Sequence, residues 1–221
     1  MNLPTKAHFI NIHTHGKAHS ANEWVLRNAF SVLSPAQIQK LPYAVSVGIH
    51  PWMAKEYALQ HIESTLDLSN VLALGEVGLD RINGPGLSVQ SEAFSAQLQL
   101  NVEYNKPVLL HIVKAYSDII PFIKKYPFPF IFHQYQGNEQ QTVQLLKYPQ
   151  VWFSFGKDLT GGRPNVEAVF QSLPLDRIFL ETDTSSRKIE EIYASAAGLK
   201  NVPIEVLKAR IFETFETVFK H

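Results

Sequence analysis

Short apolar runs alternate with longer amphipathic segments along the whole chain. Runs rich in β-branched and aromatic residues, typical of buried strands, occupy residues 8–15, 24–31, 43–51, 71–76, 107–112, 127–133, 151–156 and 177–183. Between most of these runs, apolar residues recur at helical spacing, as Phe94, Leu98 and Val102 do within residues 88–104. Strands that alternate with helices predict parallel βαβ units.

The predicted helices cover residues 35–40, 54–66, 88–104, 115–125, 139–146, 166–173, 188–197 and 203–219. Only residues 16–23 separate the first two predicted strands, which leaves little room for a helix in that crossover. We therefore expect the first crossover helix to be reduced or missing. About eight strands in this alternation predict an α/β fold, a compact TIM-type (β/α) barrel.

Several apolar runs stop at a histidine or an acidic residue. The six side chains at the predicted strand ends are His13, His15, Glu76, His111, His133 and Asp183. A buried carboxylate is costly unless it has a partner, so Glu76 is expected to face a cation, a metal or a proton. In a TIM barrel the carboxyl ends of all strands meet at one face, where active sites lie. A doubly wound open sheet, the competing topology, would not naturally bring these residues to one point. Asp80, just beyond Glu76, is predicted to be a loop or capping residue.

Length, charge and cysteine content limit the number of domains, the contact with nucleic acid and the kinds of metal ligand. The chain has 221 residues, for which one domain over residues 1–221 is the expected organisation. Its 20 basic and 20 acidic residues cancel, so contact with nucleic acid would depend on a local patch of charge. The absence of cysteine excludes disulfides and thiolate ligands, and a metal site would therefore use nitrogen and oxygen atoms.

The N-terminal segment does not predict targeting to a membrane. Polar residues and the histidines at positions 8, 13, 15 and 19 interrupt the apolar core that a signal peptide needs. We expect no membrane span and no signal peptide, which makes the cytoplasm the expected compartment. Nothing in the sequence indicates an obligate protein partner.

Six motifs resemble, in order and spacing, those of the TatD family of metal-dependent deoxyribonucleases, within the amidohydrolase-like TIM barrels. They are NIHTH at 11–15, GIHP at 48–51, GEVGLD at 75–80, KPVLLH at 106–111, HQYQG at 133–137 and ETD at 181–183. The resemblance covers nearly the whole chain. It implies a hydrolase that cleaves phosphodiester bonds in DNA, typically as an exonuclease, or a small phosphodiester substrate.

The resemblance also implies a site for two divalent metal ions. One ion would be held by His13, His15 and Asp183, the other by His111 and His133, with Glu76 as the bridge between them. Four imidazoles and two carboxylates favour Zn²⁺, Mn²⁺ or Fe²⁺ over a pure Mg²⁺ site, and zinc is the first choice as the bound metal, with Mg²⁺ or Mn²⁺ possible in use.

The expected catalytic residues are Asp183, Glu76 and His50. Two ions about 3.5–4 Å apart can hold a hydroxide between them and polarise a phosphoryl oxygen. Asp183 could accept the proton of the attacking water. His50 ends a predicted strand outside the set of six ligands, and it could bind a phosphate oxygen or protonate a leaving group.

Several positions depart from the family pattern. Asn11 stands where an aspartate is common and Val113 where an arginine is usual, while Gln136 with Gly137 and residues 184–186 replace other family motifs. Because these positions are expected to contact substrate, two alternatives stay open. One is a metallohydrolase of the same barrel that acts on another ester or an amide. The other is a metal-binding barrel without nuclease activity.

Overall fold

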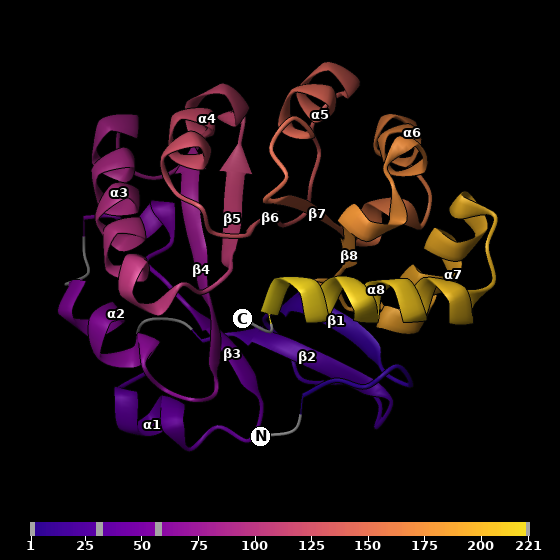
Figure 1. The fold of residues 1–221 in the computed structure, drawn as a ribbon, viewed down its shortest axis with the longest axis horizontal. Helices are drawn as coiled ribbons and strands as arrows, with labels where there is room; N and C mark the ends of the chain where they lie inside the picture. The colour runs from indigo at the N-terminus through magenta and orange to yellow at the C-terminus, as the bar shows by residue number, and fades with distance from the viewer. Residues whose placement is uncertain (1–2, 30–32, 56–58, 220–221) are drawn as a thin grey trace. The chain divides into compact units, whose positions relative to one another are not determined.

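The computed structural model describes residues 3–29, 33–55 and 59–219, and its strands form one sheet (Figure 1). Neighbouring strands follow the chain order from β1 to β8, and the pairs β1–β2, β3–β4, β4–β5, β5–β6 and β7–β8 are parallel. The strands are β1 (Phe9–Thr14), β2 (Glu23–Asn28), β3 (Ala44–Val47), β4 (Val71–Asp80), β5 (Val108–Val113), β6 (Phe130–Phe132), β7 (Val151–Phe155) and β8 (Ile178–Leu180).

The segment that follows β8 pairs with the first strand. Thr14 and Asp183 form a parallel bridge. The backbone N–H of Asp183 donates to the carbonyl of His13 over 3.0 Å, and the N–H of His15 donates to the carbonyl of Asp183 over 3.1 Å. A parallel sheet in chain order whose last strand returns to its first is the topology of a TIM-type barrel, so the predicted fold class is confirmed.

The helices follow the predicted alternation, including its one gap. Residues 15–22, between β1 and β2, contain no helix, as expected. The predicted helix over residues 54–66 includes positions 56–58, which lie outside the described residues. The α-helices are α1 (Pro35–Gln39), α2 (Leu59–Leu66), α3 (Leu87–Tyr104), α4 (Tyr116–Lys125), α5 (Glu139–Leu145), α6 (Pro164–Ser172), α7 (Ile189–Lys200) and α8 (Ile204–Phe219), and the short 3₁₀ helices are η1 (Pro51–Met53), η2 (Lys157–Leu159) and η3 (Leu175–Arg177).

One predicted strand end is wrong. Glu76 was expected to end its strand, but β4 continues through Asp80. Beyond Glu76, β4 pairs with β5 through Gly78 opposite His111 and Asp80 opposite Val113. Gly78 has a φ of +146°, and a Cβ on it would lie 2.2 Å from the carbonyl oxygen of His111. Glycine at this position therefore allows the ladder to continue, which puts Glu76 within the strand.

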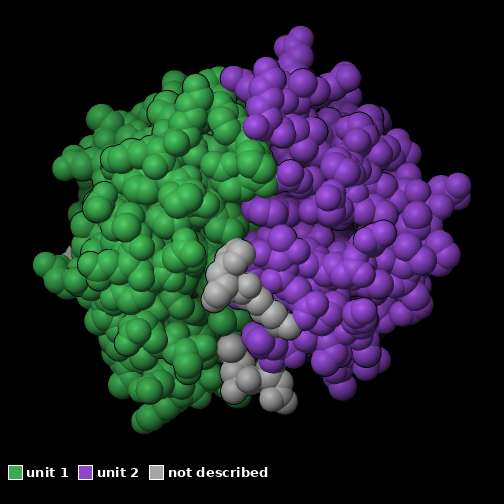
Figure 2. Space-filling view, viewed as in Figure 1, with its two compact units in different colours: residues 1, 28–132, 148–150 green, residues 2–27, 133–147, 151–221 purple. Residues whose placement is uncertain are grey.

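The described chain divides into two compact units (Figure 2). Unit 1 comprises residues 28–132 and 148–150, and unit 2 comprises residues 3–27, 133–147 and 151–219. In unit 1, α3 packs on β4 and buries Phe94 and Leu98. In unit 2, α8 packs on β1 and β8, and Phe215 meets Trp24 edge-on at 5.0 Å between ring centroids. The single domain over residues 1–221 stays a prediction.

No helix within the described residues combines the length and the apolar character needed to cross a bilayer.

Substitution of two glycines by alanine should change the free energy of unfolding in opposite directions. A Cβ on Gly75 would lie 2.5 Å from the Cβ of Leu109, whereas a Cβ on Gly198, in α7, would meet nothing within 4 Å. We expect Gly75→Ala to lower the free energy of unfolding by about 1–3 kcal/mol through overpacking. Gly198→Ala should raise it by about 0.5–1 kcal/mol, because alanine favours the helix. Thermal and denaturant unfolding measure both, and equal stabilities of the two variants would contradict the described packing.

Candidate metal centre

Unit 1 brings three possible metal ligands together. His50, Glu76 and His111 each offer a ligand atom, and these atoms lie within 4.8 Å of one another. Glu76 comes from β4, His111 from the neighbouring β5, and His50 from the residue before η1. The rings of His50 and His111 are 4.4 Å apart between centroids. His50 was expected to stay outside the ligand set, and its place in this group makes it a third candidate ligand in unit 1.

The carboxylate of Glu76 is fixed by an amide from a neighbouring strand. Asn28, at the end of β2, donates from Nδ2 to Oε2 of Glu76 over 2.7 Å, and both side chains are buried. This hydrogen bond orients the carboxylate. The role of Asn28 could not be predicted from the sequence, because nothing along the chain connects it to a residue 48 positions away.

Asp80 supports His111 from behind. Its Oδ2 atom lies 3.4 Å from Nε2 of His111 and accepts a hydrogen bond of 2.6 Å from the indole N–H of Trp52. Its Oδ1 atom accepts from the backbone N–H groups of Ile82 and Asn83, so Asp80, expected in a loop or as a cap, ends β4 and supports the turn that follows. Burial acts to raise the pKa of Asp80, but these hydrogen bonds outweigh it, so the pKa is lowered. Asp80 is therefore an ionised partner that orients the ring of His111.

Two buried glutamines of α3 bind the backbone next to His50 and at Asp80. Gln97 accepts from the N–H of Ile49 over 2.6 Å and donates to its carbonyl over 3.2 Å. About two helical turns earlier, Gln90 makes the same pair of bonds with Asp80, at 2.7 and 2.8 Å. The outer helix thereby fixes the chain next to His50 and at the end of β4.

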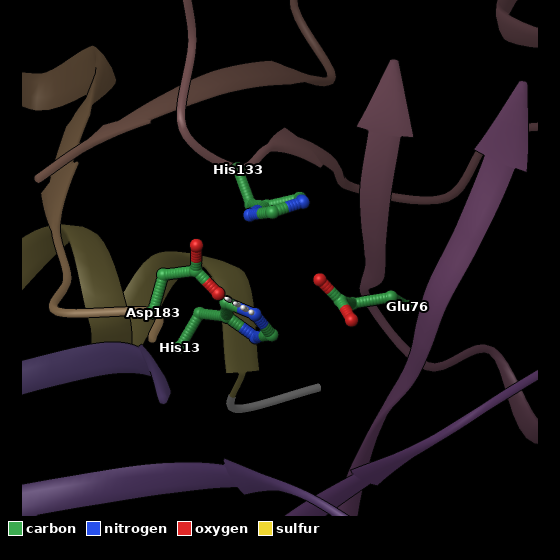
Figure 3. A group of neighbouring side chains, drawn as sticks. All are labelled: His13, Glu76, His133 and Asp183. Carbon is green, nitrogen blue, oxygen red and sulfur yellow. Dashed lines mark ion pairs between the residues drawn. The ribbon is translucent and has the colours of Figure 1, made fainter. Parts of the chain in front are cut away.

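Unit 2 assembles a second group, from His13, His133 and Asp183, whose ligand atoms also lie within 4.8 Å of one another. Oδ1 of Asp183 is 3.5 Å from Nε2 of His13 and 3.4 Å from Nε2 of His15. Figure 3 shows the contact between Asp183 and His13 as a dashed line, with the ring of His133 nearby. Asp183 has a left-handed φ of 51°, just after β8, where it pairs with β1.

Glu181 orients the ring of His133, as Asp80 orients the ring of His111. Its Oε1 atom lies 3.3 Å from Nδ1 of His133 and accepts from the backbone N–H of Gln134 over 3.0 Å. The carboxylate is fully buried. A carboxylate on one ring nitrogen fixes the orientation of the imidazole. The period of two along an extended chain, which puts Glu181 on the face of Asp183, could have indicated this residue.

Glu76 is the candidate carboxylate ligand of unit 1, and Figure 3 labels it together with His13, His133 and Asp183. Imidazole nitrogens and carboxylate oxygens are the donors that Zn²⁺ and Mn²⁺ accept in proteins, and buried carboxylates stand behind two of the histidines. The residues present therefore fit a divalent metal.

Comparison with known proteins identifies the family. Residues 31–220 match the family model described as TatD related DNase. The chain belongs to the TatD family. The matched region contains Glu76, His111, His133 and Asp183, while the motif with His13 and His15 precedes it.

Relatives of this TatD protein carry hydrolase and nuclease names. An uncharacterised metal-dependent hydrolase of Haemophilus influenzae is 26% identical over 199 residues, which is 78% of this chain and 76% of the relative. The 3′–5′ ssDNA/RNA exonuclease TatD of Musicola paradisiaca is 28% identical over 172 residues, or 72% of this chain and 63% of the relative. The TatD homologue YJJV of Escherichia coli has a TM-score of 0.85 at 21% identity, covering 98% of this chain and 100% of that one. The TIM-type fold and a metal-dependent hydrolase activity follow from these matches.

Replacing Glu181 by glutamine should weaken metal binding while leaving the fold intact. Glutamine keeps the size of the side chain but removes the charge beside His133, and loss of such a supporting partner typically costs about 10–100-fold in metal affinity. Calorimetric titration of chelator-treated protein with Zn²⁺ measures the effect. Glu213→Gln, on the exposed side of α8, is the matched control. An unchanged affinity in Glu181→Gln would show that this carboxylate does not support a ligand.

Proposed function

We propose that the six ligands expected from the sequence form one dinuclear centre that hydrolyses phosphodiester bonds of single-stranded nucleic acid, DNA first, from the 3′ end. His13, His15 and Asp183 would hold one ion, His111 and His133 the other, and Glu76 would contact both. Zinc is the proposed resident metal. The cytoplasm stays the predicted compartment.

The observation that carries this proposal is the repeated pairing of a candidate ligand with a buried carboxylate. Asp80 stands behind His111 in unit 1, and Glu181 stands behind His133 in unit 2. Burying two acidic groups against imidazoles is costly in a chain that has no use for them, because each must be desolvated. A positive charge held by these histidines would offset that cost in both units.

Divalent ions, when bound, would lower the pKa of a coordinated water and withdraw charge from the phosphoryl oxygens. The protein side chains supply the rest. Asp183 is partly open to solvent, and its Oδ2 atom accepts a hydrogen bond of 3.5 Å from Nε2 of Gln134. This carboxylate would take the proton of the attacking water.

His50 is suited to donate a hydrogen bond to substrate. Its Nδ1 atom accepts from the backbone N–H of Trp52 over 3.3 Å. In a neutral ring the proton must then sit on Nε2, which makes that nitrogen a donor, and His50 in this state is not one of the proposed metal ligands. In this proposal Nε2–H binds a phosphate oxygen or protonates the leaving oxygen, which are the two roles expected from the sequence.

The choice of substrate draws on the relatives. The Musicola paradisiaca relative is named a 3′–5′ ssDNA/RNA exonuclease, and we bring that activity to this chain. The position that departs from the family at Gln136 is occupied by an amide that donates to Asp158 over 2.9 Å. A substrate contact at this position would have to compete with that bond, so an ester or amide substrate is the second candidate.

Cleavage of a 5′-labelled single-stranded DNA tests the proposal. We expect a ladder that shortens from the 3′ end with Zn²⁺, Mn²⁺ or Mg²⁺ and disappears with chelator. Glu76→Gln should lower kcat/KM at least about 100-fold, because it removes the charge proposed to contact both ions. Glu103→Gln, exposed at the end of α3, is the control and should be unchanged.

The same assay decides between the alternatives. Hydrolysis of small esters or amides without cleavage of DNA would favour the second candidate. If no metal supports any hydrolysis, and Glu76→Gln behaves like the original protein, the chain is a metal-binding barrel without turnover and the proposed function is wrong.

A further inference from the structure

Trp52 presents a large aromatic ring to solvent beside the ligands of unit 1. Its side chain is 48% exposed, in contrast to Trp24 at 8% and Trp152 at 9%. Tryptophan side chains bury much of their surface in folded proteins, and an exposed ring next to a polar site is typical of a binding surface. The apolar run from Phe128 to Phe132 offers no such ring, since its phenylalanines are buried.

The ring is held in place from several sides. Its N–H is bound to Oδ2 of Asp80 over 2.6 Å, the same oxygen that faces His111. Its centroid lies 4.8 Å from that of His50 and 5.8 Å from that of His111, with interplanar angles of 79° and 80°. Neither imidazole therefore lies flat on the indole, and an exposed surface remains available.

The backbone under Trp52 is also supported. Pro51 starts η1 and fixes φ at the position before Trp52. A Cβ on Gly84 would lie only 2.9 Å from the Cα of Trp52, so the loop after β4 packs closely against this residue. Gly84 has a φ of +86°, which lets the loop turn at this point. A ring that is already ordered loses little conformational entropy when a ligand stacks on it.

We propose that Trp52 is a stacking platform for a nucleobase of the single-stranded substrate. The proposal rests on the nuclease function above and adds a contact outside the metal ligands. Flat, uncharged bases suit an exposed indole, and stacking is tolerant of sequence because every base has a π face. Trp52 lies directly beside His50 and His111, so a base stacked there belongs to a nucleotide next to the phosphate at the metal centre.

The alternative role for Trp52 is structural, through Asp80. If the indole mattered only for its N–H, Trp52→Phe and Trp52→Ala would be equally impaired, because both lose the hydrogen bond to Asp80. If the ring stacks on a base, Trp52→Phe keeps most of the function and Trp52→Ala loses it. Trp152→Phe, which changes a buried tryptophan bonded to the carbonyl of Asp176, is the control for general effects.

The first measurement is cleavage of two matched oligothymidylates, one complete and one with abasic residues at its two 3′-terminal positions. We expect the original protein and Trp52→Phe to prefer the complete strand at least about 5-fold in kcat/KM, mostly through KM. In Trp52→Ala the preference should fall to near one. The proposal is overturned if Trp52→Ala keeps the preference, or if the original protein has none.

The second measurement does not need turnover. Trp52 supplies the exposed indole, so its emission should be quenched when the complete strand binds in the presence of Ca²⁺, and less by the abasic strand. Loss of that quenching in Trp52→Ala but not in Trp152→Phe supports the platform, and absence of quenching in the original protein contradicts it. Quenching without cleavage by any metal would keep the platform and reject the nuclease function. Equal cleavage of the complete and the abasic strand would support the nuclease function and reject the stacking platform.

Discussion

The structure depends on the cost of placing carboxylates inside a sheet of apolar strands. Glu76, Asp80 and Glu181 are exposed by only 4%, 2% and 0%. A carboxylate removed from water is stable only where hydrogen bonds or positive charge replace its hydration. Each of these groups accepts a hydrogen bond. The donor is Asn28 for Glu76, Trp52 for Asp80 and the backbone N–H of Gln134 for Glu181. The imidazoles next to them provide the places where cations would supply the remaining charge.

The surrounding fold serves to keep those partners in register. The strand pairing sets Gly78 against His111, and the bridge from Thr14 to Asp183 brings the last strand back to the first. Helix α3 adds specific polar contacts to its apolar packing, because Gln90 and Gln97 bind the backbone of Asp80 and Ile49. Side chains that act on a substrate need support of this kind to stay within a fraction of an ångström of their working positions.

Local pattern was enough to predict the order of elements, the missing helix in the first crossover and the TIM-type topology. It was also enough to select the candidate ligands, since a histidine or an acidic residue that ends an apolar run is conspicuous. The contacts behind the ligands were not predicted. Asn28 reaches Glu76 only through strand pairing, and Trp52 reaches Asp80 only because the loop after β4 folds back near η1. The sequence pattern placed Glu76 at a strand end because Gly75 and Gly78, on either side of it, resemble a turn signal. In the structure Gly78 instead lets the strand continue.

The central claim is that side chains from distant parts of the chain hold two divalent cations at one centre. Anomalous scattering from crystals of the as-purified protein, collected on both sides of the zinc absorption edge, tests it most directly. The account predicts two neighbouring anomalous peaks, one beside His13, His15 and Asp183 and one beside His111 and His133, with Glu76 touching both. Peaks at other places, or a protein loaded with Zn²⁺ that shows no peak at these residues, would contradict it.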